Sequence, residues 1–241
     1  MAEIKAINET IIVRLKEGIE LEDSATVAKT TKLAETMKAI DGVVRVFWGP
    51  QVEDPRHCVW IIYWKAQENF TAFGASEGFG PFSAMVAEIF DVVALPPIVF
   101  MTNFNSDATA GYTAPVTEIA FFTVPKSALE EARADIEASD VSSHPVFSVG
   151  NSSGGSIGFV FLAKHAENTA PEDRTVALHG VFGYESVDDH VKWRATPEHA
   201  QVIEEMGKSK LAELGMGESN VPGGNIFLPD SNMFHVKFQA A

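Results

Sequence analysis

Apolar runs followed by segments of helical spacing occur twice along the chain, in the same order. Trp60–Trp64 ends in an aromatic residue and leads into a polar stretch that opens a helix, and Val181–Tyr184 is followed by a stretch of the same kind. The two series also begin alike, with Thr10–Leu15 matching Thr117–Phe122. A repeat of about half the chain exceeds the roughly 20–50 residues of a solenoid repeat. The pattern therefore predicts a duplicated small domain.

The first copy is predicted to have the element order βαββαβ. Ser24 is positioned to cap the first helix, which presents apolar residues on one face and ends before Gly42. A turn-rich stretch at 49–55 favours an antiparallel hairpin, and a second helical region is interrupted at 74–81. The predicted strands are Thr10–Leu15, Val43–Trp48, Cys58–Trp64 and Ile98–Phe104.

The second copy repeats this order after a linker of small and polar residues. We expect the first half at 1–105, the linker at 106–116 and the second half at 117–241. A turn rich in Gly and Ser at 150–155 separates two strands, and either of them could pair with the long strand that follows. The predicted strands are Glu118–Val124, Val146–Val149, Gly158–Ala163, Val176–Tyr184 and Met233–Phe238.

Several of the predicted strands are apolar throughout instead of alternating between apolar and polar residues. Trp60–Trp64, Ile98–Met101 and Ile119–Phe122 are examples. Such runs are typical of sheets that are covered on both faces. Helices cover one face of each sheet, and the simplest cover for the other face is the sheet of the second copy. We therefore expect an α+β fold of two tandem ferredoxin-like repeats packed sheet to sheet as a barrel within one chain, which is a monomer or a weak homodimer.

Composition and charge exclude several classes of function. The formal net charge of −15 disfavours nucleic acid and anionic membrane surfaces as partners, because both require clustered Lys and Arg. No apolar run approaches the ~20 residues that span a bilayer. Cys58 is the only cysteine, so an intramolecular disulfide and a cysteine-based metal cluster are ruled out. We expect a buried thiol in a soluble, cytoplasmic protein, and see no secretory segment.

Aromatic residues are abundant, with 17 Phe and 4 Trp, and several lie on the second helical region of the first copy. Phe82 is one of them, with Phe70, Phe73 and Phe79. Pockets for small molecules are mostly apolar and carry a few polar groups that orient the ligand. We expect an apolar or aromatic small molecule to bind between sheet and helices, with Phe82 in contact with it. The alternative is a noncatalytic protein in which these rings belong to the core.

The stretch from Tyr184 to His199 carries a resemblance to a known family. It has an aromatic residue at a strand end, a Glu-Ser-x-Asp-type helix opening and a later Pro-x-His. In these features the chain resembles the dimeric α+β barrel superfamily of antibiotic-biosynthesis monooxygenases, polyketide cyclases and stress-responsive barrel proteins, as a tandem, single-chain member of a fungal type. The resemblance implies the fold. Because the superfamily includes cofactor-free oxygenases, cyclases, decarboxylases and haem-degrading enzymes, function has to be argued from the site.

His199 is the first candidate for a catalytic base. Thr196 is placed to cap a helix and Pro197 suits its first turn, so His199 lies at a helix start, where the helix dipole disfavours the imidazolium. A neutral imidazole can accept a proton. The resemblance to polyketide cyclases implies the same role for this histidine. A histidine satisfied by a local hydrogen bond is the alternative.

The aromatic residues at the two strand ends are further candidates. Trp64 and Tyr184 are at equivalent positions, and the resemblance implies that a tryptophan there lines the ligand pocket. We expect Trp64 and Trp193 to contact substrate, and Tyr184 to stabilise a developing enolate. The alternative for each is a packing role in the core.

Two histidines interrupt apolar strands. A polar group on a buried strand needs a partner, so His179 and His235 are either satisfied in the core or face a pocket. If the last strand of the second copy lies beside its first, His235 and Glu118 could meet. The carboxylate would fix the tautomer of the imidazole and raise its basicity, which makes His235 the next candidate for a catalytic base after His199.

Motifs for nucleotide, flavin or metal binding are missing from the sequence, so we expect neither an organic cofactor nor a metal. Together these features favour a cofactor-independent enzyme of secondary metabolism that acts on an apolar, polyketide-like or aromatic substrate by histidine-mediated acid/base chemistry. Cyclisation, dehydration or decarboxylation are the reactions expected. A cofactor-free monooxygenase and a noncatalytic ligand-binding barrel are the alternatives.

Overall fold

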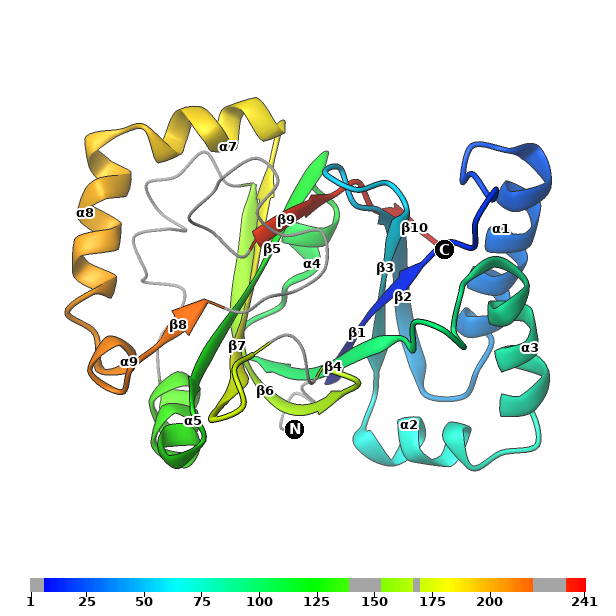
Figure 1. Ribbon diagram of the computed structural model, residues 1–241, viewed down its shortest axis with the longest axis horizontal. Helices are drawn as coiled ribbons and strands as arrows, with labels where there is room; N and C mark the ends of the chain where they lie inside the picture. The colour runs from blue at the N-terminus through cyan, green and yellow to red at the C-terminus, as the bar shows by residue number, and fades with distance from the viewer. Residues whose placement is uncertain (1–6, 139–152, 167–169, 219–232) are drawn as a thin grey trace.

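The computed structural model describes residues 7–138, 153–166, 170–218 and 233–241, and these ranges form two α+β halves side by side (Figure 1). The first half has the elements β1 (Ile7–Arg14), α1 (Ser24–Lys38), β2 (Val43–Pro50), β3 (His57–Trp64), α2 (Gln67–Gly74), α3 (Phe79–Ile89) and β4 (Ile98–Phe104). A short helix, α4 (Thr109–Tyr112), connects the halves. The second half has β5 (Val116–Pro125), η1 (Lys126–Ala128), α5 (Leu129–Ala138), β6 (Gly154–Lys164), β7 (Arg174–Tyr184), α7 (Val187–Arg194), α8 (Pro197–Met206), α9 (Lys210–Glu213), β8 (Gly217–Glu218), β9 (Met233–Val236) and β10 (Gln239–Ala240).

Each half contains an antiparallel sheet with the same strand order. In the first half β3 and β4 both pair with β1, and β2 pairs with β3, giving the order β2-β3-β1-β4. In the second half β6 pairs with β7, and β7 and β9 both pair with β5, giving β6-β7-β5-β9. The long strand 174–184 thus pairs with β6, which the sequence pattern left open. The predicted strand at Val146–Val149 lies outside the described residues.

The two sheets join along two lines and close into a barrel. At the first, β4 pairs with β6 from Val99↔Lys164 to Phe104↔Gly158. At the second, β9 pairs with β5 while β10, only two residues further on, pairs with β2 at Trp48 and Phe47. The segment 233–241 is therefore the strap that completes the barrel. The expected fold, two ferredoxin-like repeats that form an intramolecular dimeric α+β barrel, is confirmed.

Three groups of buried side chains account for the continuous apolar runs. Side chains on the inner faces of both sheets fill the barrel, as where Phe100 and Phe121 meet with ring centroids 4.3 Å apart. A second group lies between the first sheet and the helices α1 and α3, and a third between the second sheet and α5. Both faces of each sheet are thus buried, as a continuous apolar strand requires.

The helices lie on the outer faces of the sheets, with α1 and α3 on one side of the molecule and α5, α7 and α8 on the other (Figure 1). Asp23, not the predicted Ser24, caps α1, because its carboxylate accepts from the backbone N–H groups of Ala25 and Thr26. No helix within the described ranges is long and apolar enough to cross a membrane.

The connection between the halves is packed against the barrel. Tyr112 of α4 is fully buried and stacks on Phe47 with centroids 5.6 Å apart. Thr117 donates its hydroxyl to the Gly111 carbonyl, which ties the end of α4 to β5. Cys58 is buried on β3, where desolvation raises the pKa of its thiol to about 12 and keeps it protonated.

Candidate functional site

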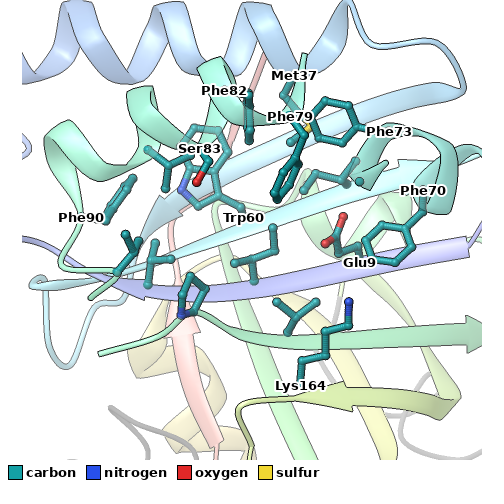
Figure 2. A pocket seen from close by; sticks show the side chains of 18 of the residues that line it. Glu9, Met37, Trp60, Phe70, Phe73, Phe79, Phe82, Ser83, Phe90 and Lys164 are labelled. Atoms are coloured by element: carbon teal, nitrogen blue, oxygen red, sulfur yellow. The ribbon is translucent and has the colours of Figure 1, made fainter. Parts of the chain in front are cut away.

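A cavity of about 570 Å³ lies in the first half, between the outer face of its sheet and the helices α1, α2 and α3 (Figure 2). This volume is within the range of ligand pockets. Most of its lining is aromatic or aliphatic, and the polar groups are few. The lining residues used below are Glu9, Trp60, Trp64, Phe70, Phe73, Phe79, Phe82, Ser83, Val99, Lys164 and His165.

Glu9 is the carboxylate of this cavity. It lies on β1 with its side chain toward the helices, and it is only 5% exposed (Figure 2). Burial in apolar surroundings raises its pKa to about 7, and this effect exceeds the opposing effects of a hydrogen bond from Trp64 and the charge of Lys164. The carboxyl group is therefore close to half ionised at neutral pH, as a general base or acid requires.

Trp64 holds Glu9 in place. The indole Nε1–H donates to Glu9 Oε2 at 2.8 Å, and the ring is almost completely buried. Two phenylalanines of α2 pack on this indole, Phe70 with its centroid at 5.9 Å and Phe73 at 6.1 Å. Phe73 in turn contacts Phe79 and Phe82 of α3 edge to face, at 5.5 Å each. The phenylalanines thus hold the Trp64 indole in place, and the hydrogen bond from this indole orients the carboxyl group.

The second half contributes two residues to the edge of this cavity. Lys164 ends β6 opposite Val99 of β4, and its ammonium lies 5.2 Å from the centroid of Phe70. The next residue, His165, also lines the cavity and adopts a left-handed backbone conformation with φ of 54°. That region is uncommon for residues other than glycine.

The equivalent place in the second half is built differently. Val116 pairs with Tyr184 as Ile7 pairs with Trp64, so Glu118 corresponds to Glu9 in the two registers. Tyr184 stacks on His190 of α7 with ring centroids 4.5 Å apart. Burial and the Glu118 carboxylate together raise the pKa of Tyr184 well above its usual range.

A buried chain of polar contacts runs from this place into the first half. His190 Nε2 lies 3.3 Å from Glu118 Oε2, and His190 Nδ1 lies 2.7 Å from His235 Nε2. His235 Nδ1 contacts Glu53 Oε1 at 2.5 Å, and its backbone N–H donates to Glu53 Oε2 at 2.9 Å. Two neutral imidazoles supply two N–H groups for three ring contacts, so the chain is complete only with one additional proton.

His199 lies at the start of α8, as the sequence predicts. Thr196 accepts the backbone N–H of His199 at 3.2 Å, and Pro197 occupies the first turn. The ring is half-buried and meets Trp193 edge to face, with centroids 4.6 Å apart. Burial, followed by the charge of Arg194, lowers the pKa of His199, so that the neutral imidazole dominates at neutral pH.

His179 lies inside the barrel. Its ring is fully buried and stacked on Phe121 at 4.4 Å, and its Nδ1 lies 3.1 Å from the hydroxyl of Thr102. Burial lowers the pKa of His179 to about 3, so the ring is neutral.

The structure thus separates the residues named from sequence into three places. Trp64 and Phe82 line the cavity of the first half. Glu118, Tyr184 and His235 meet near His190, with Trp193 and His199 nearby on α7 and α8, whereas His179 lies in the barrel. Sequence reasoning missed Glu9, Lys164, Glu53 and His190. Among the described residues, no group of three or more His, Cys, Asp or Glu side chains could hold a metal ion.

Comparisons with known proteins bear on the fold. No protein-family model and no curated protein sequence matches the chain. A protein of Lactobacillus acidophilus NCFM proposed to be a monooxygenase is similar in structure, with a TM-score of 0.54 and 12% identity over 98% of this chain and 96% of that one. This chain has the dimeric α+β barrel fold.

Two further solved structures share this barrel over most of their length. A protein of Fusobacterium nucleatum subsp. nucleatum ATCC 25586, also proposed to be a monooxygenase, has a TM-score of 0.55 and 11% identity over 100% of this chain and 95% of that one. An anthrone oxidase-like protein has a TM-score of 0.55 and 13% identity over the same shares. At such identities the likeness shows the fold alone, so the reaction has to be argued from the site.

Proposed function

We propose that the chain is a small-molecule enzyme that binds an apolar, aromatic substrate in the first-half cavity and removes a proton from it with Glu9. The observation that carries the proposal is a buried carboxyl group with a pKa of about 7 that faces a cavity of about 570 Å³ lined by aromatic rings. A base of this pKa combines a useful ionised fraction with proton affinity at neutral pH. General-base catalysis contributes typically about 10²–10⁴-fold.

The substrate class follows from what a carboxylate of this strength can deprotonate. Glu9 suits a carbon acid whose anion is delocalised into an aromatic or carbonyl system, such as an aryl ketone with an acidic methylene. The surrounding rings exclude water and stack on a flat substrate. The resulting carbanion supports cyclisation, dehydration or decarboxylation.

Oxygenation is the second candidate function. A delocalised carbanion can react with dioxygen, and a methylene then becomes a carbonyl with release of water. The names of the structurally similar proteins, two proposed monooxygenases and an anthrone oxidase-like protein, support this alternative. Both candidate functions begin with the same proton transfer.

His199 is the second candidate base. It is neutral at neutral pH and half-buried beside Trp193, in keeping with the role expected from sequence. Its location on α8 separates it from the cavity, so Glu9 is the stronger candidate.

We further propose that the protein acts as a monomer or a weak homodimer in a reducing compartment. The β4–β6 and β2–β10 pairings close the barrel internally, and a partner chain is not required for either.

Anthrone provides a direct test, because it is flat and aromatic and carries one acidic methylene. The protein is incubated with anthrone in D₂O without oxygen, and loss of the methylene signal is followed by NMR. We expect exchange faster than in buffer, with Glu9→Gln slowing it by about 10²–10⁴-fold and His199→Gln leaving it unchanged. Repeating the experiment in air and measuring oxygen uptake distinguishes oxygenation from proton transfer alone.

The controls separate the roles. Glu68→Gln makes the same charge change on the exposed face of α2 and should have no effect. Loss of exchange in His199→Gln, but not in Glu9→Gln, would make His199 the base. If anthrone and other aryl ketones stabilise the protein against heat without any exchange, the cavity is that of a noncatalytic binding protein.

A further inference from the structure

Lys164 is a cation at an apolar cavity in an acidic protein. The chain has 33 Asp and Glu against 18 Lys and Arg, so a lysine can readily find a carboxylate. Among the described residues, no ion pair within 4.0 Å includes Lys164. Its ammonium lies instead over the ring of Phe70, at 5.2 Å from the centroid. The side chain therefore presents to the cavity edge a positive charge that acts on Glu9 and forms no direct ion pair among the described residues (Figure 2).

The backbone fixes this placement. Lys164 pairs with Val99 across the β4–β6 junction, so its Cα is held by the barrel and not by a loop. The chain turns immediately afterwards through the left-handed conformation of His165, whose side chain also lines the cavity. Sparsely populated backbone conformations in residues other than glycine occur often at ligand sites.

The charged residues of the cavity determine which charged groups a ligand can have and where they can lie. Glu9 is the buried carboxyl group on which the charge of Lys164 acts, and when ionised it repels a second anion nearby. Lys164, at the exposed edge, attracts one. A ligand with flat apolar rings and one anionic group would place its rings against Phe70 and Phe79 and its charge at Lys164.

We propose that Lys164 is a specificity-determining residue, which selects aromatic ligands that carry one anionic group (a carboxylate, sulfonate or phenolate) over neutral ligands of the same shape. The inference rests on the proposed function of the cavity. It adds that the second half of the chain supplies the anion-binding residue to the site of the first half. Ligand selection is then a property of the joined barrel.

Two fluorescent probes with one skeleton test this. 8-Anilinonaphthalene-1-sulfonate is N-phenyl-1-naphthylamine with an added sulfonate, so a difference between them reports the anion. We expect Lys164→Gln to weaken binding of the sulfonate about fivefold, the scale of one partly exposed ion pair, and to leave the neutral probe unchanged. Lys164→Arg should retain the affinity for the sulfonate, and added salt should weaken binding of the sulfonate only.

The controls keep the inference separate from the proposed function. Lys192→Gln removes an exposed lysine of α7 and should affect neither probe. Ser83→Trp places an indole at the cavity and should weaken both. If Lys164→Gln changes both probes equally or neither, Lys164 is not a specificity residue, although the cavity remains a binding site. If the neutral probe does not bind saturably, or Ser83→Trp has no effect on it, the proposed function of the cavity is itself overturned.

Discussion

Burial of Glu9 has two opposing consequences, one for the stability of the fold and one for the acidity of the carboxyl group. An ionisable group buried among phenylalanines is a poor contributor to stability, because folding removes the carboxylate from water. The same burial raises its pKa to about 7 and makes it a base at neutral pH. The residue that destabilises the fold is thus the one to which we assign the proton transfer.

Replacing Glu9 should therefore stabilise the protein at alkaline pH. The folded pKa of about 7 lies above the ordinary value of 4.5, so this group favours folding fully below pH 4.5 and loses that contribution as pH rises toward 7. Glu9→Gln should be more stable than the wild type by about 3 kcal/mol at pH 8, with little difference at pH 4.5. Urea unfolding at the two pH values measures this, and Glu68→Gln is the control. A gain that is the same at both values would refute the assignment.

Trp64 should tune the base. Its indole N–H stabilises the ionised carboxylate, so Trp64→Phe should raise the pKa of Glu9 above about 7. The pH dependence of anthrone exchange should then move to higher pH. Trp60→Phe changes another ring of the same cavity and should not move the profile. An unchanged profile in Trp64→Phe would mean that the exchange does not depend on Glu9.

At the scale of single residues, the sequence identifies aromatic residues of the cavity but misaligns the first strands of the two halves. Trp64 and Phe82 could be named because aromatic residues stand out in apolar runs. Glu9 was missed because Thr10 was matched with Thr117, whereas the strand registers match Glu9 with Glu118, two positions away from that alignment. Lys164 could not be predicted, because its place at the cavity depends on the pairing of β4 with β6.

The strap 233–241 is the element that depends most on buried polar contacts. Glu53 accepts two hydrogen bonds from His235, one from the backbone and one from the ring, and both side chains are almost fully buried. The carboxylate comes from the connection between β2 and β3, so this pair fastens the strap to the first half.

Removing the Glu53 carboxylate should loosen the strap. Glu53→Ala leaves two donors of His235 without their acceptor, and we expect a loss of about 3 kcal/mol in the free energy of unfolding. Glu53→Gln keeps one acceptor oxygen and should lose less. Asp54→Ala removes a half-exposed carboxylate that pairs with His57, and should cost about 1 kcal/mol or less. Equal losses for Glu53→Ala and Asp54→Ala in urea unfolding would contradict this role.

The elements themselves were largely predictable. Period and strand composition located the strands of the first half to within a few residues, because both faces of each are buried. The N-cap of α1 is Asp23, one residue before the predicted Ser24. Asp and Ser are both favourable N-cap residues, so the sequence alone does not decide between two neighbouring positions. The sequence allowed His235 and Glu118 to meet if the last strand lies beside β5, and the two residues do face each other in that register. His190 contacts both of them, and the carboxylate that contacts the His235 ring directly is Glu53.

At the scale of the whole molecule, one core belongs to both halves. Side chains from β1, β3 and β4 pack inside the barrel with those from β5, β7 and β9. The inner face of each sheet is buried against the other half, so separating the halves would expose both inner faces to water.

The two halves should therefore unfold together. Three of the four tryptophans, Trp48, Trp60 and Trp64, lie in the first half, so tryptophan fluorescence reports mainly on it. Ile119→Ala, in the barrel side of β5, should destabilise the protein by about 2–5 kcal/mol and shift the fluorescence transition by the same amount as the circular dichroism transition. A fluorescence transition that Ile119→Ala leaves unmoved would show that the halves unfold independently.

The barrel was predictable because continuous apolar strands need a cover on both faces. A pocket between sheet and helices with Phe82 in it was predictable as well, and the cavity lies there. Its polar lining by Glu9 and Lys164 was not. Equivalent places in the two halves hold Phe70 beside Trp64 in one and His190 beside Tyr184 in the other, so the two repeats share a fold and differ in the chemistry of this place.

The closing strap also sets the order of events during synthesis. The outer edge of β2 stays unpaired until β10 has been synthesised, because Trp48 pairs with Gln239, which is distant in sequence. Contacts so distant in sequence form slowly, and an unpaired strand edge is a template for association with other chains. A nascent chain that stops at 232 would carry open edges on both β2 and β5, and we expect it to aggregate, as light scattering would reveal. The segment 233–241 thus decides whether the strand edges of β2 and β5 pair within the chain or with a neighbouring chain.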